Sequence, residues 1–179
     1  MRKFLLAALL LCPLPAHAGM ALGKLGWEVS LQTKAQKKIY HAIAEWMLPP
    51  SPTVKMRPRI VVEIDNSAGP AVAAVVMRYA FSAKLRPIQG PGPGVWGVPF
   101  QLEERRIPNI KGGAKKDAEL FLNRVQLANY LKRMHSAGFW PEAFRVQVML
   151  DPHAGEALAG RISESELPVR WRANGNADE

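Results

Sequence analysis

The chain has 179 residues, and 24 Lys and Arg against 15 Asp and Glu give it a formal net charge of +9 at pH 7. Hydrophobic residues make up 48% of the sequence, which is ordinary for a globular protein and too much for a mainly disordered chain. The length excludes a large multidomain enzyme and allows one domain of ordinary size. The basic excess favours anionic partners.

The N-terminal segment 1–18 has the three parts of a secretory signal peptide. Arg2 and Lys3 form a basic start, residues 4–12 are an apolar run, and residues 16–18 (Ala-His-Ala) supply small residues for cleavage. The apolar run is shorter than the roughly 20 residues that a membrane-spanning helix needs, and no later run approaches that length. We therefore expect an exported protein, periplasmic or secreted, with no transmembrane segment.

The single cysteine, Cys12, lies inside the apolar run of this segment. A lipid-attachment cysteine normally follows a small residue, but Leu11 precedes Cys12, so we interpret it as an apolar residue of the signal peptide. Cleavage after Ala18 would remove it. The mature chain would then contain no disulfide, no thiol nucleophile and no thiolate metal site.

Residues 19–56 are expected to precede the main domain. The segment 19–29 is mixed in composition, and we expect it to be poorly ordered. The segment 33–48 is expected to be an amphipathic helix, because Thr33 and Gln36 fit a capping box and apolar residues follow at helical spacing. This helix would either dock on a membrane or partner or, as we prefer, pack on the domain that follows. Prolines then form a stiff linker: Pro49, Pro50 and Pro52.

The main domain is expected over residues 57–172, where the hydrophobic period changes to two. Alternating apolar residues predict strands over 57–65 and 71–85. The segment 66–70 (Asn-Ser-Ala-Gly-Pro) between them has turn chemistry. We expect these two strands to form an antiparallel pair.

A third strand is predicted over residues 96–102. Pro99 cannot donate to a strand ladder, so this strand should lie at an edge or a bulge. The charged residues 103–106 (Glu-Glu-Arg-Arg) should end the strand and protect the edge from pairing with another chain. The segment 109–116 is expected to be a basic, glycine-rich turn.

One helix is predicted late in the chain, after a short strand over 119–122. Asn123 can cap its start and Gly138 can end it. Further strands are predicted over 144–150 and 167–171.

These elements predict a mainly β fold, because there is no regular alternation of strands and helices. We expect an antiparallel two-sheet sandwich, Ig-like, with one inserted crossover helix and the N-terminal amphipathic helix. The tail 173–179 has no core residues and should be disordered.

We find no motif that carries catalysis. No serine lies in a nucleophile elbow, and the sequence has no His-Glu-x-x-His motif, EF-hand loop or phosphate loop. We therefore expect a protein that is not an enzyme and needs no cofactor. Nucleic acid is not an expected partner, because the chain is predicted to be exported and has no motif of a known reader.

The one candidate for a bound group is a metal site, for which the sequence signal is weak. Met134, His135 and His153 offer thioether and imidazole ligands that would suit copper. The simpler interpretation, which we favour, is a core methionine beside an exposed histidine at a helix end.

The interaction candidates are a loop and a set of basic residues, although the simpler role of the basic residues, which we favour, is to keep the protein soluble. The loop 90–94 (Gly-Pro-Gly-Pro-Gly) is either a binding loop or a solvated connector, and Trp96 follows it. The interaction candidates are Trp96, Arg105, Arg106, Lys111, Lys115 and Lys116.

Two functions remain open at this point. The first is a non-enzymatic, exported protein that interacts with another protein or with an anionic component of the cell envelope. The alternative is a periplasmic protein that binds a small ligand or copper. The residues proposed for that alternative are Trp96, Trp140, His135 and His153.

Overall fold

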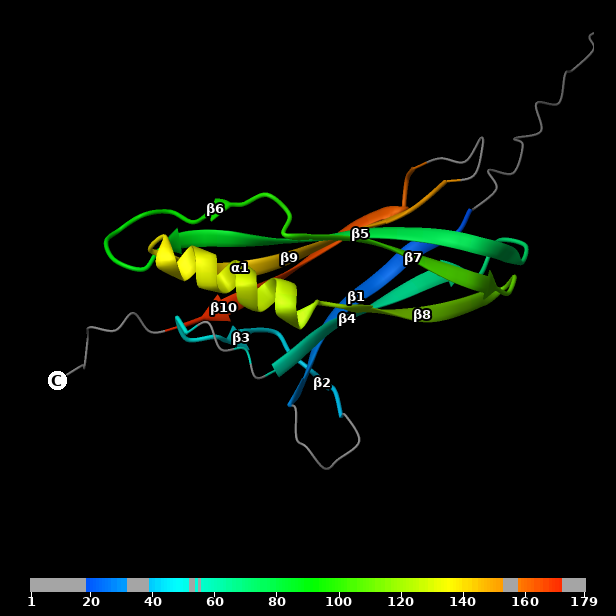
Figure 1. The fold of residues 1–179 in the computed structure, drawn as a ribbon. Coiled ribbons are helices and arrows are strands. Elements are labelled where there is room, and N and C mark those ends of the chain that lie inside the picture. The colour runs from blue at the N-terminus through cyan, green and yellow to red at the C-terminus, as the bar shows by residue number, and fades with distance from the viewer. Residues whose placement is uncertain (1–18, 32–38, 52–53, 55, 153–157, 172–179) are drawn as a thin grey trace, which may run out of the picture.

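The computed structural model describes residues 19–31, 39–51, 54, 56–152 and 158–171. The chain is mainly β, with two sheets and one helix (Figure 1). Within these residues, the one helix is too short and too polar to cross a membrane. Several sequence predictions concern residues outside the described part: the signal peptide 1–18 with Cys12, the start of the predicted helix (33–38), Pro52, His153 and the tail 173–179.

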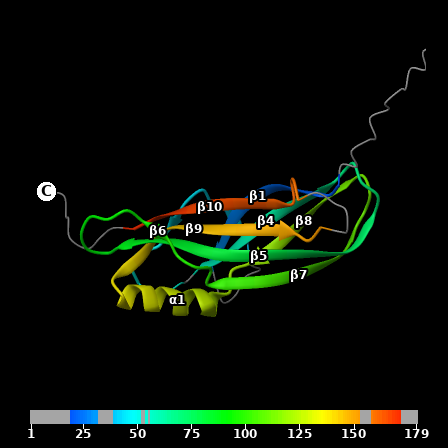
Figure 2. The ribbon, with the colours of Figure 1, turned by 90° about the horizontal axis from the view of Figure 1, so that it is seen from above.

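Eleven elements follow one another along the chain: β1 (Ala21–Leu31), β2 (His41–Ala42), β3 (Trp46–Met47), β4 (Met56–Asn66), β5 (Val72–Pro87), β6 (Val95–Trp96), β7 (Gln101–Ile110), β8 (Ala114–Phe121), α1 (Arg124–Ser136), β9 (Phe139–Leu150) and β10 (Ile162–Arg170). The four-stranded sheet has the order β2-β1-β4-β8. The six-stranded sheet has the order β3-β10-β9-β5-β6, and β7 also pairs with β5. Figure 2 shows β10, β9, β5 and β7 side by side.

The two strands predicted from alternation are confirmed as β4 and β5. Ile60, Val62 and Ile64 of β4 are fully buried, as the period of two requires. Their predicted pairing is wrong, because β4 belongs to the four-stranded sheet and β5 to the six-stranded sheet. The connecting turn carries the chain between sheets, and the Asn66 amide anchors it by donating to the carbonyl of Pro70 at 2.7 Å.

The segment 19–29, which we expected to be poorly ordered, forms most of strand β1. This strand pairs with β4 from Ala21 opposite Asp65 to Leu31 opposite Met56. A register irregularity between Leu22 and Leu25 interrupts the alternation. That irregularity hides the strand pattern in the sequence, because a bulge shifts which residues share a face.

The predicted helix over 33–48 is not confirmed. Residues 33–38 lie outside the described part, and residues 39–48 contain the short strands β2 and β3 instead. Trp46 is only 2% exposed, and its ring lies 5.5 Å from that of Phe144. Packing of this indole in the core overrides the local helical spacing, and it brings β3 alongside β10 as a parallel pair.

The predicted third strand is divided into β6 and β7, with Pro99 in the connection between them. Both strands lie on the same side of β5, and the expected edge position is confirmed. Residues 103–106 lie in the middle of β7, because this strand continues to Ile110. The predicted turn 109–116 is reduced to 111–113, where Gly113 has a φ of +70°.

The predicted helix after Asn123 is confirmed as α1. The Asn123 side chain accepts hydrogen bonds from the backbone N–H groups of Val125 and Gln126 at 3.0 and 3.2 Å. Gly138 follows the helix with a φ of +80°. The helix connects β8 of one sheet to β9 of the other, as a crossover, and Figure 1 shows it running beside β5.

The two sheets share one core and meet along two seams. On one seam, the Leu22 N–H of β1 donates to the Gly160 carbonyl, which precedes β10, at 2.7 Å. On the other, the Gln101 amide of β7 donates to the Phe121 carbonyl of β8 at 3.0 Å. The buried cluster includes side chains from both sheets and from α1. The Ig-like strand order is not confirmed, and the β3–β10 pair is parallel rather than antiparallel.

Candidate functional site

An apolar pocket of about 600 Å³ lies between the loop that connects β5 and β6 and the C-terminal end of α1. We call it the helix-end pocket. Small-molecule sites in proteins commonly have volumes of roughly 300–1,000 Å³. The residues that line it come from β5, the loop, β6, α1 and β9: Leu85, Pro87, Gly92, Pro93, Val95, Trp96, Gly97, Met134, Ala137 and Phe139. Figure 1 shows the end of α1 beside this loop.

Backbone contacts hold the loop against the rest of the molecule. The Ile88 N–H donates to the Gly138 carbonyl at 2.9 Å, which ties the start of the loop to the end of α1. Gly94 packs so closely on Glu142 that a β-carbon there would collide with the carboxylate. A side chain at this position would require the flexible end of Glu142 to move.

Trp96 forms one wall of the pocket, and Arg145 packs on its ring. The Arg145 guanidinium lies over the Trp96 ring, 4.0 Å from its centroid. The adjacent Gly97 N–H donates to the Ala83 carbonyl at 2.9 Å, which continues the contact with β5. Nearby, Lys84 Nζ lies 2.8 Å from Glu142 Oε1. The Arg145 contact and the Gly97 hydrogen bond restrain the indole before any ligand binds.

Beneath the pocket, aromatic rings connect α1 to the core. The rings of Phe100 and Tyr130 are stacked with their centroids 4.4 Å apart. Burial raises the pKa of Tyr130. A β-carbon on Gly97 would lie 3.3 Å from the Tyr130 hydroxyl, so a larger residue there would press on this packing.

A second hollow, shallow and polar, lies on one exposed face of α1 at the same helix end. We call it the basic hollow. It is lined by Asn129, Lys132, Arg133, Ser136 and Ala137. Because Ala137 also lines the helix-end pocket, the apolar and basic surfaces are continuous at this residue.

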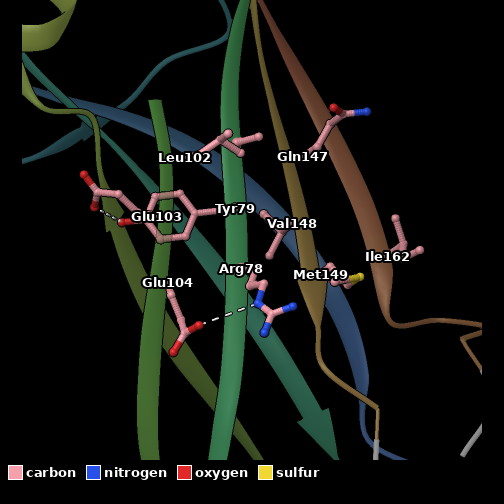
Figure 3. A pocket seen from close by; sticks show the side chains of 10 residues that line it. Arg78, Tyr79, Leu102, Glu103, Glu104, Gln147, Val148, Met149 and Ile162 are labelled. Carbon is pink, nitrogen blue, oxygen red and sulfur yellow. Dashed lines mark hydrogen bonds and ion pairs between the residues drawn. The ribbon is translucent and has the colours of Figure 1, made fainter. Parts of the chain in front are cut away.

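A third hollow, the outer groove, has a volume of about 530 Å³ and lies on the outer face of the six-stranded sheet (Figure 3). Leu102 and Ile162 flank it and are 73% and 58% exposed, and Met149 lies between them. Its charged groups neutralise one another. Arg78 lies 3.0 Å from Asp151 and 3.6 Å from Glu104.

The structure places the predicted basic candidates on β7, on β8 and in the turn between them, away from Trp96. Most of them have partners within the chain. Arg105 donates to the Glu119 carbonyl, Arg106 lies 3.6 Å from Glu104, and Lys116 donates to the Asn109 carbonyl at 2.8 Å. Lys111 is exposed in the turn.

Lys115 is the most firmly held of these basic residues. Its Nζ lies 2.8 Å from Glu63 and 3.2 Å from Asp65, and hydrogen bonds to these carboxylates raise the pKa of Lys115. The pKa of Asp65 is lowered to about 2, mainly by hydrogen bonds from the hydroxyl and N–H of Ser67 and then from Lys115. These interactions join β8 to β4, and they already occupy the ammonium group of Lys115.

Of the metal candidates, Met134 and His135 are in the described part of the chain, and they have different surroundings. Met134 lines the helix-end pocket, whereas the ring of His135 makes an edge contact with Trp140 at 5.8 Å. Trp140 is fully buried and donates to the Leu48 carbonyl at 2.9 Å. His153 lies outside the described residues. Within the described part of the chain, no group of three or more His, Cys, Asp or Glu could hold a metal ion.

The sequence identified only part of the helix-end pocket, namely the Gly-Pro loop, Trp96 and Met134. It missed Phe139 and Val95, although Val95 is 67% exposed and follows the loop directly. No protein-family model matches this chain, and no curated protein matches it either.

Proposed function

We propose that this protein is an exported, non-enzymatic binding protein that acts in cell-envelope interaction by holding an apolar group in the helix-end pocket. The single observation that supports this most strongly is the composition of the pocket. Its lining residues are Leu, Pro, Gly, Val, Trp, Met, Ala and Phe, contributed by separate segments of the chain. None of these described residues has a nucleophilic or titratable side chain, which supports binding rather than catalysis.

The energetics of such a pocket favour an aliphatic or aromatic group. Each buried methylene stabilises a complex by about 0.8 kcal/mol, and an indole wall adds a large rigid contact area. The wall is prearranged, because Arg145 holds the Trp96 ring and the β5 backbone holds Gly97. Less ordering is then required when the ligand binds.

The proposed fold and location agree with this role. We propose that the two sheets form a sandwich, because side chains from both contribute to one buried cluster. Export is proposed from the signal-peptide pattern of residues 1–18. A pocket formed by loops at one end of a sandwich is a common place for recognition.

The test is a titration with N-phenyl-1-naphthylamine, an uncharged probe whose fluorescence rises in apolar surroundings. The wild type should bind it saturably. Met134→Glu should weaken binding by at least about tenfold, because it places a charge in an apolar site, and Val95→Glu, at the exposed rim of the pocket, should weaken it by a smaller amount. Val95 is largely exposed, so its variant keeps the test valid if Met134→Glu is unstable.

Met149→Glu is the matched control. It places the same charge in the outer groove, at a side chain that is half-buried like Met134. It should bind the probe as the wild type does. Loss of binding in Met149→Glu with no loss in Val95→Glu would move the site to the outer groove and contradict the proposal, as would a wild type that does not bind the probe.

A further inference from the structure

We propose that the ligand is a single-chain amphiphile with an anionic headgroup, its chain in the helix-end pocket and its headgroup beside Lys132 and Arg133. This inference rests on the proposed function, and it adds the chemical class of the ligand. It is carried by the continuity of an apolar pocket with a basic hollow at one helix end.

The first step is geometric. Ala137 lines both hollows, so the exposed face of α1 that carries Lys132 and Arg133 begins at the rim of the helix-end pocket. Asn129 and Ser136 add polar groups beside the two cations. A ligand with an apolar chain and a polar end matches this order of surfaces.

The second step is the sign of the charge. Helix α1 contains no Asp or Glu, and it contributes Lys132 and Arg133 to the hollow. Both side chains are exposed, and neither has an ion pair with another described residue. The one carboxylate placed beside the pocket, that of Glu142, is already paired with Lys84 at 2.8 Å. The surroundings therefore favour an anion over a neutral or cationic group.

The third step compares how much the apolar pocket and the basic hollow each contribute to the binding free energy. Exposed cations contribute little binding free energy individually, so an inorganic anion would gain only weak binding in the basic hollow. Burial of an alkyl chain supplies the larger share of affinity. The headgroup contacts then select among chains of equal length, which makes an amphiphile the best match.

The experiment is calorimetric titration with three monomeric amphiphiles that share one chain: myristate, monomyristoyl glycerol and myristyltrimethylammonium. We expect the wild type to bind myristate most tightly and the cation most weakly. The double variant Lys132→Gln/Arg133→Gln should weaken myristate binding about fivefold and leave monomyristoyl glycerol unchanged. Val95→Glu should weaken binding of both.

A double variant with the same change in charge, Lys24→Gln/Lys111→Gln, is the control, because both of its lysines are exposed and lie outside the two hollows. It should bind myristate as the wild type does. Equal affinity for all three amphiphiles, or equal loss in both double variants, would overturn the headgroup assignment and leave the apolar pocket standing. Failure of all three to bind, or binding unaffected by Val95→Glu, would overturn the pocket itself.

Discussion

The indole N–H of Trp27 donates a hydrogen bond to the hydroxyl of Ser165 at 3.1 Å, and so connects β1 of one sheet to β10 of the other. The Trp27 ring also packs on Phe81, with centroids 6.1 Å apart. Strand β1, which precedes the domain predicted from residue 57, is therefore part of the core, and it closes one of the two seams between the sheets.

Substitution of Trp27 tests this role. Trp27→Ala should reduce the free energy of unfolding by about 3–5 kcal/mol, because it leaves a large cavity between the sheets. Trp27→Phe keeps an aromatic ring and loses the hydrogen bond to Ser165, so it should cost less. Chemical denaturation gives both values. Val125→Ala, at a helix position that is mostly exposed, should change stability little; a similarly small effect of Trp27→Ala would show that β1 lies outside the core.

The Asn123 side chain caps the N-terminal end of α1, the helix whose C-terminal end lies beside the Gly-Pro loop. Asn123→Ala should destabilise the protein by about 1 kcal/mol, because the N–H groups of Val125 and Gln126 lose their acceptor. Asn123→Asp keeps an acceptor oxygen and should remain close to the wild type. Equal stability of both variants in thermal unfolding would mean that the cap does not stabilise the helix.

The buried hydroxyl of Tyr79 makes stability depend on alkaline pH. Burial, followed by the hydrogen bond to Glu103 at 2.6 Å, raises the pKa of Tyr79 well above the usual value near 10. Above that pH the unfolded chain loses a proton that the folded chain retains, so this contribution to stability is present below pH 10 and falls as the pH rises.

Tyr79→Phe isolates this effect. At pH 7 the variant should be less stable than the wild type by about 1 kcal/mol, since it loses the hydrogen bond to Glu103. The difference between the two proteins should shrink as the pH rises above about 10. Denaturant unfolding at a series of pH values measures it, and a difference that grows over that range would contradict the assignment.

The Asp65 carboxylate gives a test at acid pH. Its pKa of about 2 depends first on the hydrogen bond from the Ser67 hydroxyl, so Ser67→Ala should raise it toward the usual value near 3.8. A lowered carboxylate pKa contributes stability above the unfolded value, and this is lost as the pH falls toward 2. The Ser67→Ala variant should lose this contribution to stability at a higher pH than the wild type does. Carbon NMR of the Asp65 carboxyl group follows the titration, and an unchanged midpoint would show that Ser67 is not the cause.

Local patterns predicted the elements better than their arrangement. β4 and β5 have uninterrupted alternation, and Asn123 and Gly138 mark the ends of α1, so these elements could be predicted from neighbouring residues. The turn 66–70 is compatible with either a hairpin or a change of sheet, and only the pairing of distant strands decides between them. Trp46 fits a helical period equally well, and its burial against Phe144 was not visible in the sequence.

Local sequence patterns likewise identified only part of the candidate site. The Gly-Pro loop and Trp96 stand out in the sequence because glycine, proline and an adjacent indole are unusual together. Phe139 and Lys132 do not, because they reach the site only through the path of α1 from one sheet to the other. A pocket assembled from separate segments is a property of the tertiary structure.

The most direct test of the binding site is methyl NMR of protein labelled at the methionine methyl groups and titrated with myristate. Met134 lies in the helix-end pocket and Met149 in the outer groove, so each reports on one hollow within the same molecule. We predict a saturable shift of the Met134 methyl resonance with no shift of Met149. A shift of Met149 with Met134 unchanged, or no shift of either, would contradict the helix-end pocket as the binding site.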